Sequence, residues 1–263
     1  MERQGEVVLM GFVKTREELD AYYGLAYRKF YGAEMLGLMF ETKPEIIKRL
    51  LPPPLEPGEN PTGMMFIAHY PETNLGPGYR ESALFISCRY GGEAGSYCLS
   101  MPIDDETRMH NGRDIYGFPK KLAVIHTERE GQEVNGRVER NGVRFVEIKA
   151  SLTGSLPELP ELGPVFLFKG MPRADLEPGF DGPVYLVRQK TDIEMKSFEI
   201  GTGELVLLES DADPWAEIEV TNVLVYFYLV SDNTMQPGSV LAEVDPDEYL
   251  PYYYKMTDLY TGE

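Results

Sequence analysis

Short apolar runs, rich in aromatic and β-branched residues, recur along the chain after residue 63 and are separated by Gly, Pro, Asn and Asp. This spacing predicts an antiparallel, mostly β structure. The predicted strands cover residues 64–70, 81–90, 97–102, 121–127, 134–140, 143–152, 165–169, 184–190, 192–199, 204–208 and 216–230. Asn141-Gly142 lies between two of them and is the strongest hairpin signal, because both turn positions tolerate positive φ.

Two helices are predicted before this β-rich part. Thr15-Arg16-Glu17-Glu18 has the spacing of a capping box and predicts a helix that extends to about residue 29. A second such box, Thr42-Lys43-Pro44-Glu45, predicts a helix with Pro44 in its first turn, which ends before the prolines at 52–54. The apolar segment 34–41 between the two helices favours a buried strand.

The chain has no internal repeat, low-complexity tract or composition shift that marks a linker, and the Pro-rich stretch 157–164 is the single candidate hinge. We therefore expect one domain over residues 1–263. So many strands in one domain need closure or stacking to remove exposed edges. The expected fold class is mostly β (α+β), an antiparallel β-cone or barrel with a few flanking helices.

The formal net charge of −18 repels nucleic acid and anionic lipid, so neither is an expected partner. Cys88 and Cys98 are the two cysteines, and we expect buried free thiols in a reducing cytoplasm. Residues 1–6 lack the basic patch and apolar core that mark a signal peptide. No apolar run approaches the roughly 18 residues of a membrane span. These observations predict a cytoplasmic protein.

The chain contains no sequence motif for metal binding or phosphate binding. His69, His110 and His126 are scattered, and neither zinc-like spacing nor an EF-hand loop occurs. The glycine-rich residues 91–95 lack the Lys and Ser/Thr of a phosphate-binding loop, and no Gly-x-Ser-x-Gly motif is present. We therefore expect no bound metal, and the remaining candidate catalytic groups are amines and carboxylates.

The segment 111–121 holds two adjacent lysines, Lys120 and Lys121, after an aromatic, glycine-flanked turn. Most Lys-Lys pairs are solvated, because burying an ammonium is costly without a partner. The other interpretation is nucleophilic catalysis, in which a neutral amine attacks a ketone and forms an imine. An ordinary lysine has a pKa near 10.4, and burial in an apolar pocket disfavours its charged form.

Successive side chains of a strand point to opposite faces, so one of the two lysines faces away from any site that the other enters. We expect Lys120 to be buried against Tyr116, Phe118 and Leu122, and Lys121 to be a minor contributor. Glu81 opens an apolar strand and is either a pocket carboxylate or a solvated edge residue. Arg113 is either a surface charge or a second positive group in the same cavity.

The segment from Gly112 to Lys121 resembles the Gly-Arg-Glu…Pro-Lys-Lys signature of the acetoacetate decarboxylase family. Segments 42–56 and 79–82 are similar to that family's Thr-Asp-Pro-Glu…Leu-Pro-x-Pro-Leu-Glu and Tyr-x-Glu-Ser. The resemblance implies a β-cone fold, a homo-oligomer and a small keto acid substrate, with no external cofactor. It also implies that Lys120 is the Schiff-base lysine, Lys121 its neighbour and Glu81 a pocket glutamate.

The chain departs from the family pattern at two positions. Ala33 stands where the decarboxylase has an arginine, and no carboxylate occurs near Phe66-Ile67, where the family has a second glutamate. Relatives that act as pyruvate-dependent aldolase-dehydratases often have Gln before Pro-Lys-Lys, whereas this chain has Phe118. The leading hypothesis is thus a lysine-imine decarboxylase, a carbon–carbon lyase of a β-keto acid. An aldolase-dehydratase and a non-catalytic binder of small apolar ligands are the alternatives.

Overall fold

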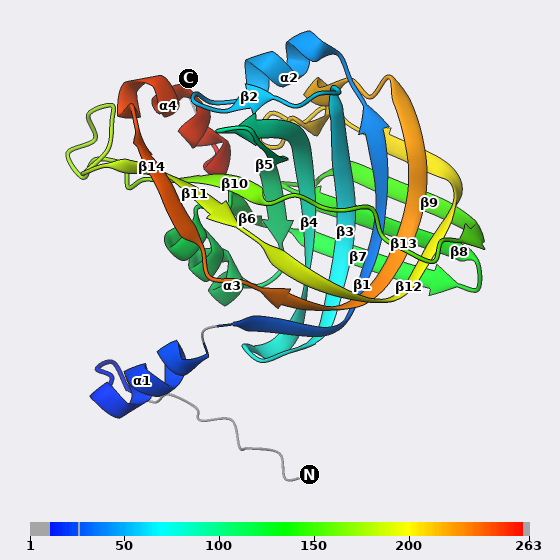
Figure 1. Cartoon of the computed structure of the whole chain (residues 1–263), viewed down its shortest axis with the longest axis horizontal. Coiled ribbons are helices and arrows are strands. Elements are labelled where there is room, and N and C mark those ends of the chain that lie inside the picture. Colours follow the sequence, from blue (N-terminus) through cyan, green and yellow to red (C-terminus); the bar gives the residue numbers. More distant parts are fainter. Residues whose placement is uncertain (1–10, 26, 260–263) are drawn as a thin grey trace.

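The computed structural model describes residues 11–25 and 27–259. Within these residues, fourteen strands form one curved sheet (Figure 1). The strands are β1 (Arg28–Glu41), β2 (Glu56–Pro57), β3 (Thr62–Thr73), β4 (Gly76–Tyr90), β5 (Glu93–Ile103), β6 (Lys120–Leu122), β7 (Val124–Glu130), β8 (Glu133–Arg140), β9 (Val143–Ser155), β10 (Val165–Lys169), β11 (Val184–Gln189), β12 (Thr191–Leu207), β13 (Asn222–Met235) and β14 (Ser239–Val244). The predicted mostly β fold class is confirmed.

Short helices flank the sheet. They are α1 (Arg16–Gly24), α2 (Pro44–Leu50), α3 (Glu106–Asn111), the π-helix η1 (Gly112–Tyr116), the 3₁₀-helices η2 (Trp215–Ile218) and η3 (Tyr254–Met256), and α4 (Pro246–Tyr253). In Figure 1, α2 lies at the upper rim of the sheet, while α1 projects away from its body. Tyr249 of α4 is buried and stacks on Phe168 of β10, so the tyrosines near the C-terminus pack this helix onto its own chain.

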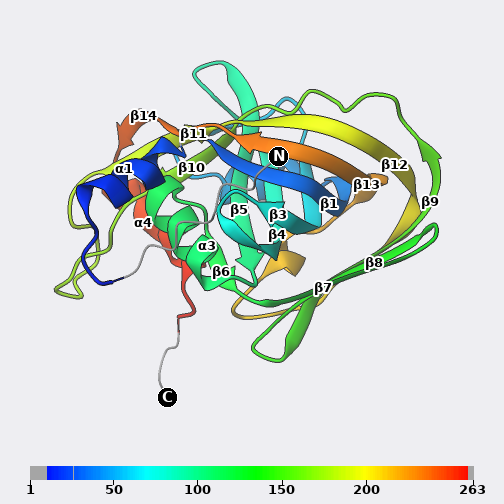
Figure 2. The same ribbon diagram turned by 90° about the horizontal axis from the view of Figure 1, so that it is seen from below.

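The strand order is β14-β11-β10-β5-β4-β3-β1-β13-β12-β9-β8-β7, with β2 paired to β4 and β6 paired to β5. Most neighbours are antiparallel, but β10 and β6 both run parallel to β5. The hydrogen-bonded path ends at β14 and β7, so the described strands do not form a hydrogen-bonded ring. The sheet instead curls until β7 contacts β3 and β4 (Figure 2).

The first capping box is present, with Thr15 accepting from the Glu18 backbone and Glu18 reaching back. The helix ends at Gly24 instead of about residue 29, because the chain from Arg28 onward pairs with β13. The second predicted box is wrong. Thr42 Oγ1 donates to the carbonyl of Ile218, and the N-cap of α2 makes no side-chain hydrogen bond. Long-range contacts of β1 therefore override the local capping signal.

Several predicted strands differ in extent from the observed ones. The run 121–127 is divided between β6 and β7, whereas 192–199 and 204–208 are parts of the continuous β12. The run 216–230 begins as η2 and becomes a strand at Asn222, and β14 was not predicted. The hairpin signal is confirmed, since Asn141 and Gly142 have φ values of 50° and 77°.

The two faces of the sheet carry different interiors. One face packs the larger hydrophobic core around Leu36, Met65, Phe145 and Trp215. The other face carries two smaller apolar clusters, which include Phe66 and Phe227. Alternation along the strands produces this division, because neighbouring residues point to opposite faces. The site described below lies on the second face.

Both cysteines are buried and free, as predicted. Among the described residues, no helix has the length and apolar character needed to cross a membrane. The segment 1–6, on which the expectation about a signal peptide was based, lies outside the described residues.

Candidate active site

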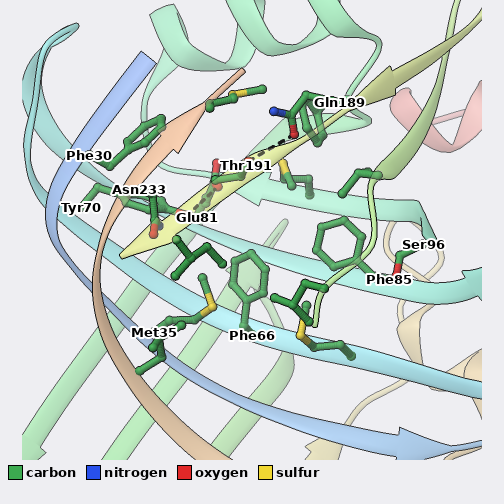
Figure 3. A pocket seen from close by; sticks show the side chains of 18 of the residues that line it. Phe30, Met35, Phe66, Tyr70, Glu81, Phe85, Ser96, Gln189, Thr191 and Asn233 are labelled. Atoms are coloured by element: carbon green, nitrogen blue, oxygen red, sulfur yellow. Dashed lines mark hydrogen bonds between the residues drawn. The ribbon is translucent and has the colours of Figure 1, made fainter. Parts of the chain in front are cut away.

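A cavity of about 250 Å³ lies on the second face of the sheet. Side chains of β1, β3, β4, β12 and β13 form its wall, and Figure 3 shows Phe66, Phe85 and Met35 pointing into it. Leu159 and Leu162 also line the cavity. They belong to the Pro-rich stretch 157–164, which therefore covers the site. Most of this lining is apolar, so a charged group inside the cavity has little solvent around it.

Lys120 begins β6 and enters the cavity with 6% of its surface exposed. Its Nζ lies 2.6 Å from Glu81 Oε2, and both side chains are less than a tenth exposed. The rings of Phe118 and Tyr79 surround the amine, with centroids 5.7 Å and 6.0 Å from Nζ. The amine therefore has one carboxylate partner in an otherwise aromatic environment.

Two glycines of the preceding turn make room for Lys120. A Cβ atom at Gly112 would lie 2.6 Å from Lys120 Cε, so the lysine side chain passes directly over this glycine. Gly117 ends η1 with φ 87° and ψ 19°, a conformation that L side chains rarely adopt. The change of direction at Gly117 leads the chain into β6, next to β5. A π-helical turn such as η1 is rare and frequently occurs at functional sites.

Glu81 is held from both sides. Its Oε2 accepts from Lys120, and its Oε1 accepts from the Tyr70 hydroxyl at 3.1 Å. Burial raises the pKa of Tyr70 well above its ordinary value, and the charge of Glu81 raises it further. Tyr70 therefore stays protonated and acts as a hydrogen-bond donor. This donor and the register of β3 against β4 fix the carboxylate beside the amine.

Lys121 points away from the cavity. Its Nζ lies 2.7 Å from Asp213 Oδ1 and 3.3 Å from Asp258 Oδ1. Arg140 joins both carboxylates, at 2.9 Å and 2.7 Å. The guanidinium of Arg140 holds the pKa of Asp258 well below its usual range. This network of two cations and two anions attaches β6 to the segments around Asp213 and Asp258. Lys121 therefore helps to hold β6 in place.

The other residues expected at the site divide into two groups. Tyr116 and Phe118 line the cavity, whereas Leu122 does not and is 44% exposed. Arg113 is not among the lining residues, and its guanidinium lies close enough to Tyr253 to counter the effect of burial on the pKa of that phenol. The expectation of Arg113 in the pocket is therefore not met. The π-helical turn places residues 113 and 116 in different directions, which sequence spacing could not indicate.

Sequence reasoning missed Tyr70, Arg28 and Arg108 as cavity residues. Tyr70 could have been found, because strand alternation places it on the same face as Phe66, and a β3–β4 hairpin brings it near Glu81. Arg108 donates to the carbonyls of Leu75 and Pro77 and pairs with Asp105, so it fastens the tip of this hairpin. Arg28 lies beside Tyr116. No local pattern marks either arginine.

Among the described residues that line the cavity, Glu81 is the one carboxylate, and no His or Cys accompanies it. Nowhere in the part of the chain that the structure describes do three or more His, Cys, Asp or Glu side chains gather as metal ligands. The chemistry that this arrangement can perform is proton exchange between Lys120 and Glu81, coupled to attack of the amine on an electrophile.

Residues 11–244 match the family model of acetoacetate decarboxylase. The chain is 30% identical over 219 residues to an acetoacetate decarboxylase of Burkholderia cenocepacia, which covers 81% of this chain and 87% of the relative. A crystal structure of acetoacetate decarboxylase from Legionella pneumophila superposes with a TM-score of 0.73 at 24% identity, covering 83% of this chain and 90% of that one.

An enduracididine biosynthesis enzyme in complex with pyruvate has the same fold, with a TM-score of 0.72 at 20% identity over 82% of this chain and 90% of that chain. The family model spans far more than half of the sequence, and it includes both Glu81 and Lys120. The chain therefore belongs to the acetoacetate decarboxylase family of carbon–carbon lyases.

Proposed function

We propose that this protein is a cofactor-free decarboxylase that acts on a small β-keto acid through an imine on Lys120. The observation that carries the proposal is the buried amine of Lys120, which lies 2.6 Å from Glu81 inside an apolar cavity. Structural lysines rarely enter an apolar cavity, because the charged form loses its hydration there. A nucleophilic lysine needs this environment, because only the neutral amine attacks a carbonyl.

Glu81 accepts and donates the proton that is transferred in the first step. The Lys120 ammonium first gives one proton to Glu81, which leaves a neutral amine that attacks the ketone carbon. A second proton moves from nitrogen to the former ketone oxygen, and Glu81 then donates its proton to the resulting hydroxyl, which leaves as water. The product is a protonated imine. Tyr70 keeps Glu81 in place through its hydrogen bond to the other carboxylate oxygen. Tyr70 is therefore a positioning residue.

Carbon dioxide leaves in the second step. The bond between the α-carbon and the carboxylate carbon breaks, and its electron pair moves to the iminium nitrogen to give an enamine. Protonation of the α-carbon and attack of water on the imine then release a methyl ketone and restore the amine. Phe118 and Tyr79 place aromatic surface beside Nζ, which suits a neutral departing molecule better than a charged one.

Trapping of the imine tests this proposal. Incubation with acetoacetate and borohydride should add mass to the peptide that contains Lys120 and to no other. The variant Lys120→Met should lose the adduct, while Lys149→Met, which changes a half-exposed lysine of β9, should keep it. Failure to form an adduct with acetoacetate and with every other keto acid tried would eliminate the imine mechanism. It would favour a non-catalytic binder of apolar ligands, whose affinity Lys120→Met would leave unchanged.

The alternative within the same chemistry is a pyruvate-dependent aldolase-dehydratase. Phe118 argues against it, because an apolar side chain does not orient the second carbonyl of an aldol partner. The two reactions differ in their products. A decarboxylase releases carbon dioxide from a β-keto acid, whereas the aldolase forms its adduct with pyruvate and produces an enone absorbance. Measuring both signals with the same preparation distinguishes them.

We also propose that the protein works as a homo-oligomer in the cytoplasm. The two unpaired cysteines support a reducing compartment. Large exposed apolar side chains, including Tyr23 of α1 at 71% and Leu176 at 93%, support contacts between copies. Light scattering of the purified chain should give a mass that is a multiple of 29.8 kDa, and cell fractionation should recover it with soluble cytoplasmic markers. A monomer in scattering would refute the first part.

A further inference from the structure

The cavity extends well beyond the Lys120–Glu81 pair. Glu81 on β4 stands opposite Ala68 on β3, which in turn stands opposite Met35 on β1. The row continues from Met35 to Leu229 on β13 and then to Phe198 on β12. Neighbouring strands lie about 4.8 Å apart, so four steps along the curved sheet separate Glu81 from Phe198 by about 19 Å.

The far part of this row is apolar on all sides. We call it the apolar arm and define it by six cavity-lining residues, Met35, Met64, Phe66, Phe198, Phe227 and Leu229. The charged residues that line the cavity within the described chain are Arg28, Glu81, Arg108 and Lys120, and none of them belongs to the arm. The same cavity is lined by Lys120 and Glu81 at one end and by Phe198 of the arm at the other, so the two ends are continuous.

Acetoacetate does not explain the apolar arm. In any β-keto acid the carboxylate is two bonds from the ketone carbon, so an imine at Lys120 holds the carboxylate close to the amine. The substituent on the other side of the ketone is the one part that can extend away from Nζ. In acetoacetate that substituent is a methyl group, which leaves the arm without an occupant. Apolar cavities with this shape match apolar ligand groups.

We infer that the preferred substrates are β-keto acids whose ketone carries an unbranched or aromatic apolar chain, and that the apolar arm binds this chain. The inference rests on the proposed decarboxylase function and specifies its substrate class. The reaction is unchanged, with the bond to the carboxylate carbon broken and the product a longer methyl ketone plus carbon dioxide. Thioether and aromatic side chains, such as Met35 and Phe198, adapt well to flexible apolar groups.

A substrate series tests the inference with the wild-type protein. Carbon dioxide release is measured for straight-chain acids from 3-oxobutanoate to 3-oxodecanoate. Burial of each methylene should raise kcat/KM by about fourfold until the arm is filled. If carbon dioxide is released but kcat/KM stays constant or falls along the series, the inference is wrong. The proposed function would still stand. No turnover and no borohydride adduct with any member would overturn both.

A variant that fills the arm provides the second measurement. Met35→Trp should lower the ratio of kcat/KM for 3-oxodecanoate to kcat/KM for 3-oxobutanoate by about tenfold or more. Met171→Trp is the matched control, because Met171 is 61% exposed and lies outside the cavity lining. Equal losses for both substrates would contradict the assignment of the arm. If Met35→Trp does not fold, the wild-type series decides the question.

Discussion

Gly117 is the residue whose replacement most directly tests how the turn places Lys120. Its φ of 87° is one that alanine adopts only with strain, about 1 to 2 kcal/mol. An alanine Cβ at this position would also lie 2.7 Å from the carbonyl carbon of Phe168. That carbonyl belongs to β10, which pairs with β11 and β5 and cannot easily move. Overpacking of this kind adds about 1 to 3 kcal/mol.

Gly142 is the matched control for this substitution. Its φ of 77° is similar, but a Cβ there would meet no atom within 4 Å. Gly142→Ala should therefore cost the strain alone, and Gly117→Ala should cost about 1 to 3 kcal/mol more. Urea unfolding measures both free energies, and for one domain we expect a single transition. Borohydride trapping with a keto acid should fail for Gly117→Ala, because β6 begins three residues later.

Equal destabilisation by the two alanine substitutions would refute this reasoning. It would mean that the segment before β6 shifts freely and that contact with β10 does not determine its path. A large loss of stability in Gly117→Ala with an unchanged yield of trapped imine would also refute the reasoning. The turn would then support the fold without placing the amine.

Three further predictions concern Lys120, its neighbours and the partly buried Lys255. Gly112→Ala should reduce imine trapping strongly, because the new Cβ displaces the Lys120 side chain while the helical φ of Gly112 suits alanine; an unchanged trapping yield would contradict this. Asp213→Asn should cost at most about 3 kcal/mol in urea unfolding, because the buried Lys121 and the partly buried Arg140 lose one of the two carboxylates that they share, whereas Asp20→Asn at an exposed pair should cost less than about 1 kcal/mol. Burial lowers the pKa of Lys255 to about 7, so the unfolded chain binds more protons between about pH 7 and 10, and stability should rise with pH there by up to about 5 kcal/mol. Lys255→Met should flatten that rise in urea titrations at several pH values, and an unchanged slope would show that this amine is not the source.

Local patterns alone determined most of the secondary structure and marked the lysine pair as a candidate site. The strand at 165–169, the Asn141-Gly142 turn and the first capping box follow rules that act over a few residues, so they are visible in the sequence. The two lysines were separated correctly because adjacent strand residues face opposite ways. Resemblance to a known family then pointed to Lys120 and Glu81 before any contact was known.

Only the tertiary structure decided what surrounds Lys120. The register of β3 and β4 brings Tyr70 to Glu81, and the pairing of β1, β13 and β12 places Phe198 and Leu229 on the wall of the same cavity. These residues are far apart in sequence, and hydrophobic periodicity specifies which face a side chain takes but not which strand lies beside it. The position of Arg113 could not be predicted from the sequence either, because a π-helical turn directs it toward Tyr253. The sequence thus pointed to Lys120 as the candidate nucleophile, and long-range strand pairing determined the shape of the cavity around it.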